Sequence, residues 1–519
     1  MLSDKLNKFV LDQKICDSDQ DNNSLFIAAI NGLQQGACCS RCILRFMGCT
    51  DFSLYGPSNK ILEQAFDSAF PPTSKIQVPL CSVCLGTLQF AEQDEIIGPI
   101  VNVFEKKPYD TRSYCLSFTP PISVMTRERL MYFHLQQWLQ THVPELAQKW
   151  EDIITIDSKE PMRYLVSQQF TALSDRVFEP SSPLRITVVL EHAPSSDEHL
   201  FLTSTKKQLL VVRKVRKKGI TKIVGTSRPV VAEALKNLEA EEARVLTTVP
   251  PVPSSEKCTV KINTLHEAGY TGGRYLKFSR ECSQTPWCVR GKKLAEISVS
   301  ECIVDVLQKH HQCQAVKFTT AGREDANVRM LGTGRPFYCE LVDPVRPVLP
   351  AEEYAQMEAE INESSTKDVV QVRHICPIQL KDTNLIKAGE EFKRKTYQAL
   401  IWVSSSVTDE MVKKCNDFGR QGFEISQHTP VRVSQRRAMM ERSKQIHELS
   451  MVKVSDKEED ARFAVITMNT QAGTYIKEFV HGDLQRSLPN MASILGVEAA
   501  DLLELDVTNV DLVWPPQSN

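Results

Sequence analysis

The chain has 519 residues, of which 42% are hydrophobic and 24% are charged, so it is long enough for about two to four globular domains. Its formal net charge is −2, which excludes a globally basic nucleic-acid-binding protein and leaves such a partner to local basic patches. No apolar run approaches the roughly 18 residues that a membrane span needs. The first residues are polar, without the pattern of a signal peptide, so we expect an intracellular protein with reduced thiols and no membrane partner.

Two Cys-x-x-Cys pairs are the first motif in the chain: Cys39, Cys42, Cys81 and Cys84. A two-residue gap closes a turn in which both thiolates reach one tetrahedral ion, and two such pairs complete a four-thiolate site. We predict that they bind a structural Zn²⁺ in an N-terminal segment that covers residues 1–100. A redox pair and free buried thiols are the alternatives, and Cys38 and Cys49 are alternative ligands.

The region that follows mixes helix and strand patterns. Apolar periodicity predicts a broken helix over 125–154, and a short apolar run predicts a strand at 200–202. Residues 203–222 carry eight Lys and Arg side chains and no Asp or Glu, with the apolar residues 209–212 in their middle. We predict a strand with a basic edge that contacts a phosphate backbone, with a solvated face and a localisation signal as the alternatives.

A Pro-rich stretch at residues 247–257 predicts a stiff linker, after which residues 258–519 form one domain. Within this domain, residues 313–318 predict a strand that delivers the sequence Gly-Arg-Glu-Asp onto a turn. The glycine, Gly322, lets the backbone bend there. The Asp of this turn, Asp325, is expected to point into a cleft, and the alternative is that it caps a nearby helix.

Five stretches between residues 270 and 515 carry a family resemblance: GRYLKFSRECSQTPW, AGREDANVRMLGTGRPFYCEL, FKRKTYQALIWVS, TPVRVSQRRAMMERSKQI and QAGTYIKEFVHGDLQRSLPN. In these stretches the chain resembles the pseudouridine synthase 10 family of tRNA-modifying enzymes, and it is identified as a eukaryotic member. The paired Cys-x-x-Cys extends the resemblance toward the N-terminus. The resemblance implies an α+β protein with a C-terminal pseudouridine synthase catalytic domain on a bent, mixed and largely antiparallel sheet. It also implies an accessory domain with a zinc knuckle and, at residues 101–246, a THUMP-like α/β RNA-binding fold.

The resemblance also assigns site residues. Asp325 matches the family's catalytic Asp, which we predict to be the nucleophile. Tyr397 matches the aromatic residue that stacks on the flipped base, and a packed core tyrosine is the alternative. Lys477 matches the basic residue that pairs with the catalytic Asp and keeps it ionised, and a surface lysine is the alternative. Ile476 is expected to pack beneath the base, and Arg323 to grip a phosphate or fill the space that the base leaves.

A basic segment follows at residues 431–444, with one acid among these side chains: Arg432, Arg436, Arg437, Arg442 and Lys444. We predict an RNA-facing loop or helix there, with Arg436 and Arg437 as substrate-binding residues, and a solvated face is the alternative. Arg329 and Arg335 are further candidates for this surface. Two departures from the family pattern are Asn327, where relatives usually have a second Asp, and Gln485, where they favour Gly. A positive φ at Gln485 would be strained.

The resemblance implies isomerisation of uridine to pseudouridine in the T arm of tRNA, at position 54 with position 55 as a further target, and without an organic cofactor. The second hypothesis is a non-catalytic protein that binds structured RNA, such as a primary-microRNA processing factor, which could also be a second function. The intact set of Asp325, Tyr397 and Lys477 favours the enzyme, because binding alone needs none of them. A zinc-dependent base deaminase is excluded, because no His-x-Glu stands upstream of a Cys-x-x-Cys. We expect a monomer in the nucleus and cytoplasm.

Overall fold

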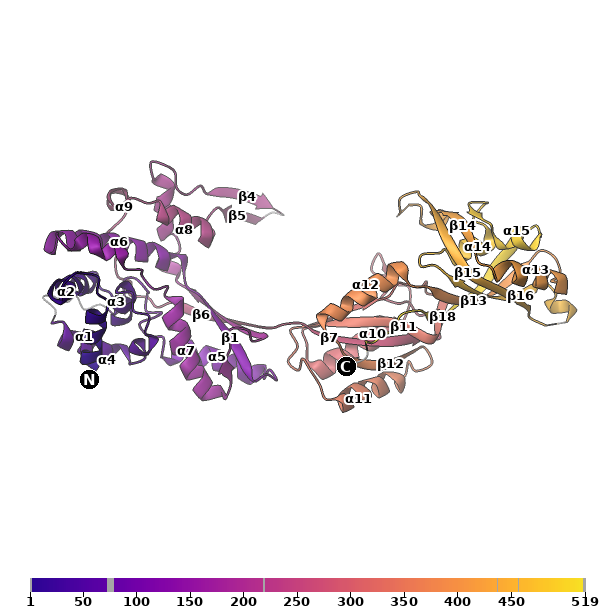
Figure 1. The fold of residues 1–519 in the computed structure, drawn as a ribbon, viewed down its shortest axis with the longest axis horizontal. Coiled ribbons are helices and arrows are strands. Elements are labelled where there is room, and N and C mark those ends of the chain that lie inside the picture. Colours follow the sequence, from indigo (N-terminus) through magenta and orange to yellow (C-terminus); the bar gives the residue numbers. More distant parts are fainter. Residues whose placement is uncertain (1, 72–78, 218–219, 436, 456, 517–519) are drawn as a thin grey trace. The chain divides into compact units, whose positions relative to one another are not determined.

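The computed structural model describes residues 2–71, 79–217, 220–435, 437–455 and 457–516. The chain divides into two compact units, Met1–Leu265 and His266–Asn519, and each has its own hydrophobic core (Figure 1). Both units combine helices with β-sheet, which confirms the predicted mixture of α and β structure. Among the described residues, no helix is both long enough and apolar enough to cross a membrane.

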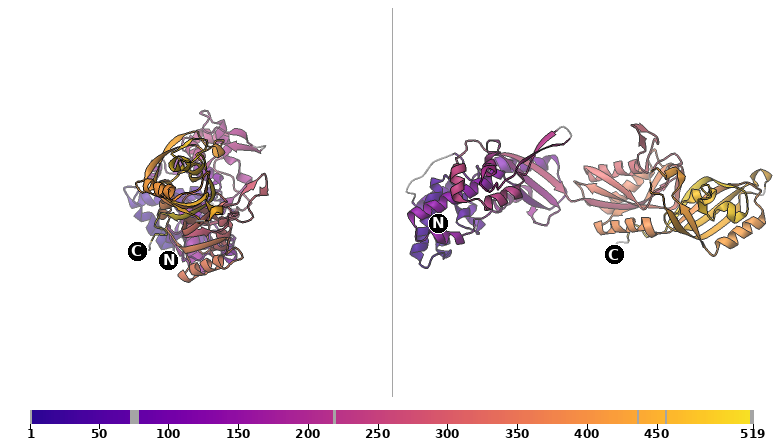
Figure 2. Two further views of the ribbon diagram at one scale, coloured as in Figure 1. Left: turned by 90° about the vertical axis from the view of Figure 1, so that its right-hand side faces the viewer. Right: turned by 90° about the horizontal axis from the view of Figure 1, so that it is seen from above.

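The first unit builds helices around a four-stranded sheet with the order β2-β1-β3-β6, in which β1 pairs parallel with β2 and β3. Its strands are β1 (Ser113–Thr119), β2 (Val177–Phe178), β3 (Leu184–Glu191), β4 (Arg213–Lys217), β5 (Ile220–Val224) and β6 (Thr259–His266). Its helices are α1 (Leu2–Asp12), α2 (Asp19–Gln35), α3 (Ser40–Phe46), α4 (Asn59–Ala69), α5 (Asp94–Lys106), α6 (Ile122–His142), α7 (Lys159–Ser174), α8 (Arg228–Lys236) and α9 (Ala240–Leu246). Strands β4 and β5 form an antiparallel hairpin that is separate from the four-stranded sheet (Figure 2).

One hydrophobic cluster runs from α1 to β3 and contains the four cysteines of the paired motif. Side chains from both sides of residue 100 therefore share a core. The predicted linker at 247–257 belongs to the first unit, whose last residue is Leu265. The predicted division of this unit at residue 100, and its THUMP-like character, stay predictions.

Of the local secondary-structure predictions in this unit, one is confirmed and others are wrong. The broken helix over 125–154 is confirmed: α6 ends at His142, and a 3₁₀ helix follows at Ala147–Asp152. The strand at 200–202 is wrong, because a 3₁₀ helix spans Glu198–Ser204. The apolar residues 209–212 precede β4 instead of forming it. Short apolar runs mark burial, as at Leu202 and Leu210, without fixing the type of backbone.

The second unit is organised on a ten-stranded sheet with the order β12-β7-β11-β18-β13-β16-β15-β14-β17, and β10 pairs with β11 off this path. Its strands are β7 (Gly269–Lys277), β10 (Ala315–Thr320), β11 (Val328–Val342), β12 (Val370–Pro377), β13 (Lys395–Val403), β14 (Phe423–His428), β15 (Glu441–Lys453), β16 (Phe463–Thr470), β17 (Ser487–Leu488) and β18 (Ala500–Val510). A small hairpin joins β8 (Cys288–Val289) and β9 (Lys292–Lys293). The helices are α10 (Val299–His311), α11 (Ala351–Asn362), α12 (Thr383–Phe392), α13 (Asp409–Gly419), α14 (Ile476–His481) and α15 (Met491–Leu495).

Strand pairing in this sheet confirms the predicted mixed, largely antiparallel arrangement. Strand β11 runs parallel to β18, and the other pairings described for the sheet are antiparallel. The strand predicted at 313–318 is confirmed as β10, which pairs antiparallel with β11. The turn between β10 and β11, residues 321–327, is therefore held between two strands of the sheet. This turn carries Asp325.

The loop after α14 has an unusual backbone. Gly482, Asp483, Leu484 and Gln485 follow one another with φ values of 79°, 46°, 61° and 65°. L-residues in this left-handed region cost roughly 1–2 kcal/mol each, because Cβ approaches the following carbonyl oxygen. The strain expected at Gln485 from its sequence is therefore present.

Replacing Gln485 by glycine is expected to stabilise the protein. Relief of about 1–2 kcal/mol of steric strain is partly offset by about 0.4–1 kcal/mol of added unfolded-state entropy, which leaves a gain of about 0.5–1 kcal/mol. Thermal unfolding of the full chain measures this gain as a higher Tm. Gln379→Gly, at a position with φ −95°, is the control and should lower the Tm. A lower Tm for Gln485→Gly would contradict the argument.

Candidate active site and cysteine cluster

A cleft of about 1600 Å³ opens in the second unit around turn 321–327. Its lining includes these predicted site residues: Asp325, Arg323, Tyr397, Ile476, Lys477 and Arg437. Arg436, also predicted, lies outside the described residues. The lining residues come from the β10–β11 turn, from β13, from the segment before β15 and from α14, so the fold brings together motifs that are far apart in the sequence.

The turn directs two neighbouring carboxylates to different environments. Glu324 is buried, and its Oε2 atom lies 2.7 Å from Nε of the buried Arg335. The next side chain, Asp325, is 48% exposed and lines the cleft. Gly322 has a φ of 88°, a backbone conformation that L side chains rarely adopt, so a glycine is needed at this point. A buried ion pair thus anchors the turn that presents Asp325.

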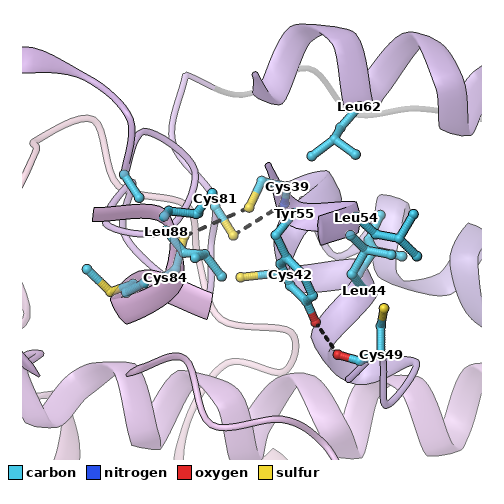
Figure 3. Packing of buried hydrophobic residues seen from close by; sticks show 14 of the residues in the cluster. Cys39, Cys42, Leu44, Cys49, Leu54, Tyr55, Leu62, Cys81, Cys84 and Leu88 are labelled. Atoms are coloured by element: carbon cyan, nitrogen blue, oxygen red, sulfur yellow. Dashed lines mark hydrogen bonds between the residues drawn. The ribbon is translucent and has the colours of Figure 1, made fainter. Parts of the chain in front are cut away.

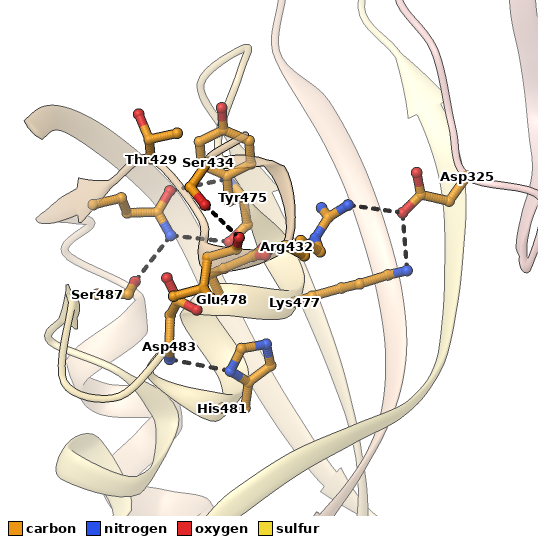
Figure 4. A network of polar contacts seen from close by, with 12 residues as sticks. Asp325, Thr429, Arg432, Ser434, Tyr475, Lys477, Glu478, His481, Asp483 and Ser487 are labelled. Carbon is orange, nitrogen blue, oxygen red and sulfur yellow. Dashed lines mark hydrogen bonds and ion pairs between the residues drawn. The ribbon is translucent and has the colours of Figure 1, made fainter. Parts of the chain in front are cut away.

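Two cations converge on the Asp325 carboxylate (Figure 4). Lys477 Nζ lies 3.0 Å from Oδ2, and an Arg432 guanidinium nitrogen lies 3.4 Å from the same oxygen. Burial raises the pKa of Asp325, but the hydrogen bond and charge of Lys477 oppose it. With the charges of Arg432 and Arg323 added, the pKa falls below its ordinary value. The carboxylate therefore stays ionised at neutral pH.

Sequence reasoning missed the part that Arg432 plays in this network. Its Nε lies 2.8 Å from the buried Glu478 carboxylate, so the guanidinium bridges Glu478 and Asp325. The basic segment at 431–444 was the signal for Arg432, although it did not indicate a carboxylate partner. Asn327, the residue noted above as a departure from the family pattern, accepts a hydrogen bond of 3.2 Å from Lys477. An amide there leaves Asp325 as the charged partner of that lysine at this turn.

Tyr397 and Ile476 supply the aromatic and apolar parts of the cleft. A register shift between β13 and β18 falls between Thr396 and Tyr397, and bulges of this kind re-aim side chains beside functional sites. Burial raises the pKa of Tyr397, with the charge of Arg335 acting in the opposite direction, so the phenol is neutral. Ile476 is buried at the first position of α14, directly before Lys477.

The basic side chains of segment 431–444 lie along the cleft in part. Arg437, Arg442 and Lys444 line it, and Arg437 donates a 3.1 Å hydrogen bond to the Tyr475 hydroxyl. The prediction that Arg335 extends this RNA-facing surface is wrong, because its side chain is buried and paired with Glu324. The sequence could not show this burial, because the sequence around an arginine in a strand does not indicate whether its side chain faces solvent or a buried carboxylate.

The four predicted zinc ligands form a buried cluster in the first unit (Figure 3). The sulfur atoms of Cys39, Cys42, Cys81 and Cys84 all lie within 4.8 Å of one another, and those of Cys39 and Cys84 are 3.9 Å apart. Four sulfurs around a tetrahedral Zn²⁺, at about 2.3 Å from the metal, would be about 3.8 Å apart. The donor set therefore fits Zn²⁺. Among the described residues, the cluster includes neither Cys38 nor Cys49, and the Cys49 thiol donates to the Asp51 carbonyl instead.

Comparisons with known proteins agree with this division of the chain. A family model described as "Pus10, C-terminal" matches residues 270–511, and one described as "Eukaryotic Pus10, N-terminal" matches residues 81–263. The human "tRNA pseudouridine synthase Pus10" is 34% identical over 441 residues, which are 84% of this chain and 79% of that protein. The protein of the same name from Pyrococcus furiosus is 34% identical over 257 residues, 49% of this chain and 60% of that protein. A chain of the solved structure "Crystal Structure of a Cbf5-Nop10-Gar1 Complex" aligns with a TM-score of 0.25 and 16% identity over 46% of this chain and 48% of that chain, which is too weak to carry an argument.

Proposed function

Because this chain belongs to the Pus10 family of tRNA pseudouridine synthases, we propose that it isomerises uridine to pseudouridine in the T arm of tRNA, at position 54, with position 55 as a further target. The observation that carries the proposal is the position of the Asp325 carboxylate: it lines a large cleft, and its Oδ2 atom lies 3.0 Å from Lys477 Nζ. The resemblance drawn from the sequence stretches is confirmed at the level of the family, including its eukaryotic branch.

Asp325 acts as the nucleophile in this proposal. The bond between uracil N1 and ribose C1′ breaks, and the carboxylate adds to the sugar or to the base while the base is detached. The uracil turns and bonds to C1′ through C5, and the bond between the carboxylate and the sugar or base breaks, which leaves Asp325 as a free carboxylate again. C5 then loses its hydrogen as a proton and N1 gains one, so the RNA keeps its composition and no cofactor is consumed. Lys477 keeps Asp325 ionised in readiness for this step.

The target base must leave the RNA stack to reach Asp325, and the cleft offers residues of the right chemistry for that step. Tyr397 would stack on the extruded base, with Ile476 beneath it. Trp287, which is 46% exposed and also lines the cleft, offers a second aromatic surface. Arg323 and Arg437 would contact neighbouring phosphates, which is where most of the affinity of such proteins for RNA arises.

We propose that the cysteine cluster holds one structural Zn²⁺ that ties the N-terminal helices to the rest of the first unit. Four sulfur ligands leave no coordination position for water, so the metal would supply no chemistry to the reaction. The first unit, with its predicted THUMP-like sheet, would hold the acceptor end of the tRNA while the cleft takes the T loop. A place in the nucleus and cytoplasm and a monomeric state remain our proposals.

The proposal is tested by mapping pseudouridine at single-nucleotide resolution in an unmodified tRNA transcript after incubation with the protein. We expect product at position 54, the map shows whether position 55 is a further target, and a transcript with cytidine at both positions is the control. A primary-microRNA hairpin in the same assay tests the alternative. Tight binding to that hairpin, with no pseudouridine in either RNA, would overturn the enzyme proposal in favour of a structured-RNA-binding protein.

Replacing Lys477 by methionine is expected to raise the pKa of Asp325, because the largest contribution that opposes burial is then lost and the weaker charges of Arg432 and Arg323 remain. A lowered pKa keeps the carboxylate ionised as the pH falls. When the pKa of Asp325 rises in Lys477→Met, the acid limb of the kcat/KM profile therefore moves to higher pH. The profile of Lys477→Arg, which keeps the charge, should stay near that of the wild type. An acid limb that is unmoved in Lys477→Met would show that this lysine does not set the ionisation of Asp325.

A further inference from the structure

The backbone around Asp325 is held by a lysine that is itself out of reach of any substrate. Lys277 is the last residue of β7, and it is completely buried. Its ammonium donates three hydrogen bonds, to the carbonyl oxygens of Ala326 at 2.7 Å, Cys282 at 2.9 Å and Ser279 at 3.2 Å. Ala326 directly follows Asp325, so one buried side chain fixes the peptide next to the reactive carboxylate.

Burying this charge is unfavourable, which makes its placement informative. An isolated ammonium in a protein interior loses its hydration, and proteins usually compensate with a carboxylate or with a full set of acceptors. Here, three carbonyl oxygens take the three N–H donors. Burial lowers the pKa of Lys277, and the negative charge of nearby Glu324 acts against that shift. Residue 277 is thus a lysine with a hydrogen-bonded ammonium, although burying an apolar side chain there would cost less free energy.

Two neighbours of Lys277 reinforce the same turn. Arg280 donates to the carbonyl of Asn327 at 3.1 Å, and Gln284 donates to the carbonyl of Gly322 at 3.1 Å. The segment 277–284 therefore contacts the turn at Gly322, Ala326 and Asn327, and Lys277 contacts it at the peptide directly after Asp325. Asn327 in turn receives its side-chain hydrogen bond from Lys477, the partner of Asp325.

We propose that Lys277 is a positioning residue for the reaction: it fixes the Ala326 carbonyl so that the Asp325 carboxylate stays in register with Lys477 and with the bound base. The inference rests on the proposed function, because positioning has a meaning only if Asp325 reacts. A shift of about 1 Å in a reacting group lowers a rate by about 100-fold. A donor at this peptide therefore controls turnover without touching RNA.

The test compares Lys277→Met with Arg274→Met in the full chain. Arg274 lies on the same strand and is also a buried cation that donates to carbonyls, yet its hydrogen bonds go to residues 333–334 and 510–514. Both variants lose buried hydrogen bonds and are expected to be less stable. Only Lys277→Met should lower kcat on a tRNA transcript, by about 10- to 100-fold, with KM within about threefold of the wild type because no RNA contact is removed.

Hydrogen exchange of the amides in residues 323–330, measured by mass spectrometry on the RNA-free protein, gives a readout that does not depend on activity. Exchange should accelerate in Lys277→Met and stay at the wild-type rate in Arg274→Met. Lys277→Gln keeps two N–H donors, should be intermediate in both assays, and replaces the methionine variant if that one does not fold. Unchanged exchange, or equal loss of kcat in the two methionine variants, would overturn the proposal. An inactive wild type would instead refute the proposed function, while the exchange comparison would still show whether Lys277 holds the turn.

Discussion

Asp325→Asn is expected to abolish pseudouridine formation, with a rate at least about 10⁴-fold below that of the wild type. The amide has nearly the shape of the carboxylate and can still accept a hydrogen bond from Lys477, whose Nζ is 3.0 Å away. It has no negative charge with which to attack the sugar or the base. A loss of activity in Asp325→Asn would therefore be due to the missing nucleophile and not to a change in the fold. Single-turnover conversion of a tRNA transcript measures it.

Binding of tRNA by Asp325→Asn should be equal to that of the wild type or tighter, because the change removes a negative charge from a cleft that is rich in Arg and Lys. Asp409→Asn is a matched control. Asp409 also pairs with a lysine, Lys453, at 2.6 Å, but its side chain is 93% exposed and lies outside the lining of the cleft. Activity that survives in Asp325→Asn, or is lost equally in Asp409→Asn, would show that Asp325 is not the nucleophile.

Cys39→Ser and Cys84→Ser are each expected to remove the bound metal, from about one Zn²⁺ per chain to none. Structural zinc sites contribute about 10–16 kcal/mol to folding in zinc-finger peptides at pH 7. The cluster here lies inside a much larger hydrophobic core, so we do not expect the first unit to unfold completely when the metal is lost. We expect its thermal unfolding to lose cooperativity instead. Metal analysis and calorimetry of the full chain measure the two effects.

The control for the zinc prediction is Cys49→Ser. Cys49 is buried in the same core, but its thiol donates to the Asp51 carbonyl and lies away from the four sulfurs (Figure 3). Its zinc content should be that of the wild type. Chelation of the wild-type protein should reproduce the calorimetric change of Cys39→Ser. Full zinc content in both Cys39→Ser and Cys84→Ser would contradict a site built from these cysteines.

Sequence motifs predicted which residues lie at the site, but they did not predict all of the side chains that pair with one another there. Asp325 and Lys477 are separated by most of the second unit, and their motifs placed them at a common site because each motif has its own match in the family. The ion pair of Glu324 with Arg335 had no such signal. Adjacent acids in a turn look alike in a sequence, and only the sheet decides that one side chain faces the core and the other the cleft.

The local errors have a related cause. Residues 200–202 and 209–212 are apolar because Leu202 and Leu210 pack against α6 and α8, and burial of this kind does not require a strand. Lys277 shows the same limit for charge. A lysine at the end of a strand, in a basic loop, suggests contact with phosphate, whereas the structure buries it against backbone carbonyls. Pairing with carbonyls leaves no mark in the sequence.

The central claim is that this chain converts uridine to pseudouridine in tRNA, and release of tritium from [5-³H]uridine tests it most directly. The C5 hydrogen is lost only when the base rejoins the sugar through C5. We predict that a full-length, unmodified tRNA transcript labelled at every uridine releases tritium to water with the wild-type protein and none above background with Asp325→Asn. Retention of all tritium by the wild type, in a tRNA that it binds tightly, would contradict the account.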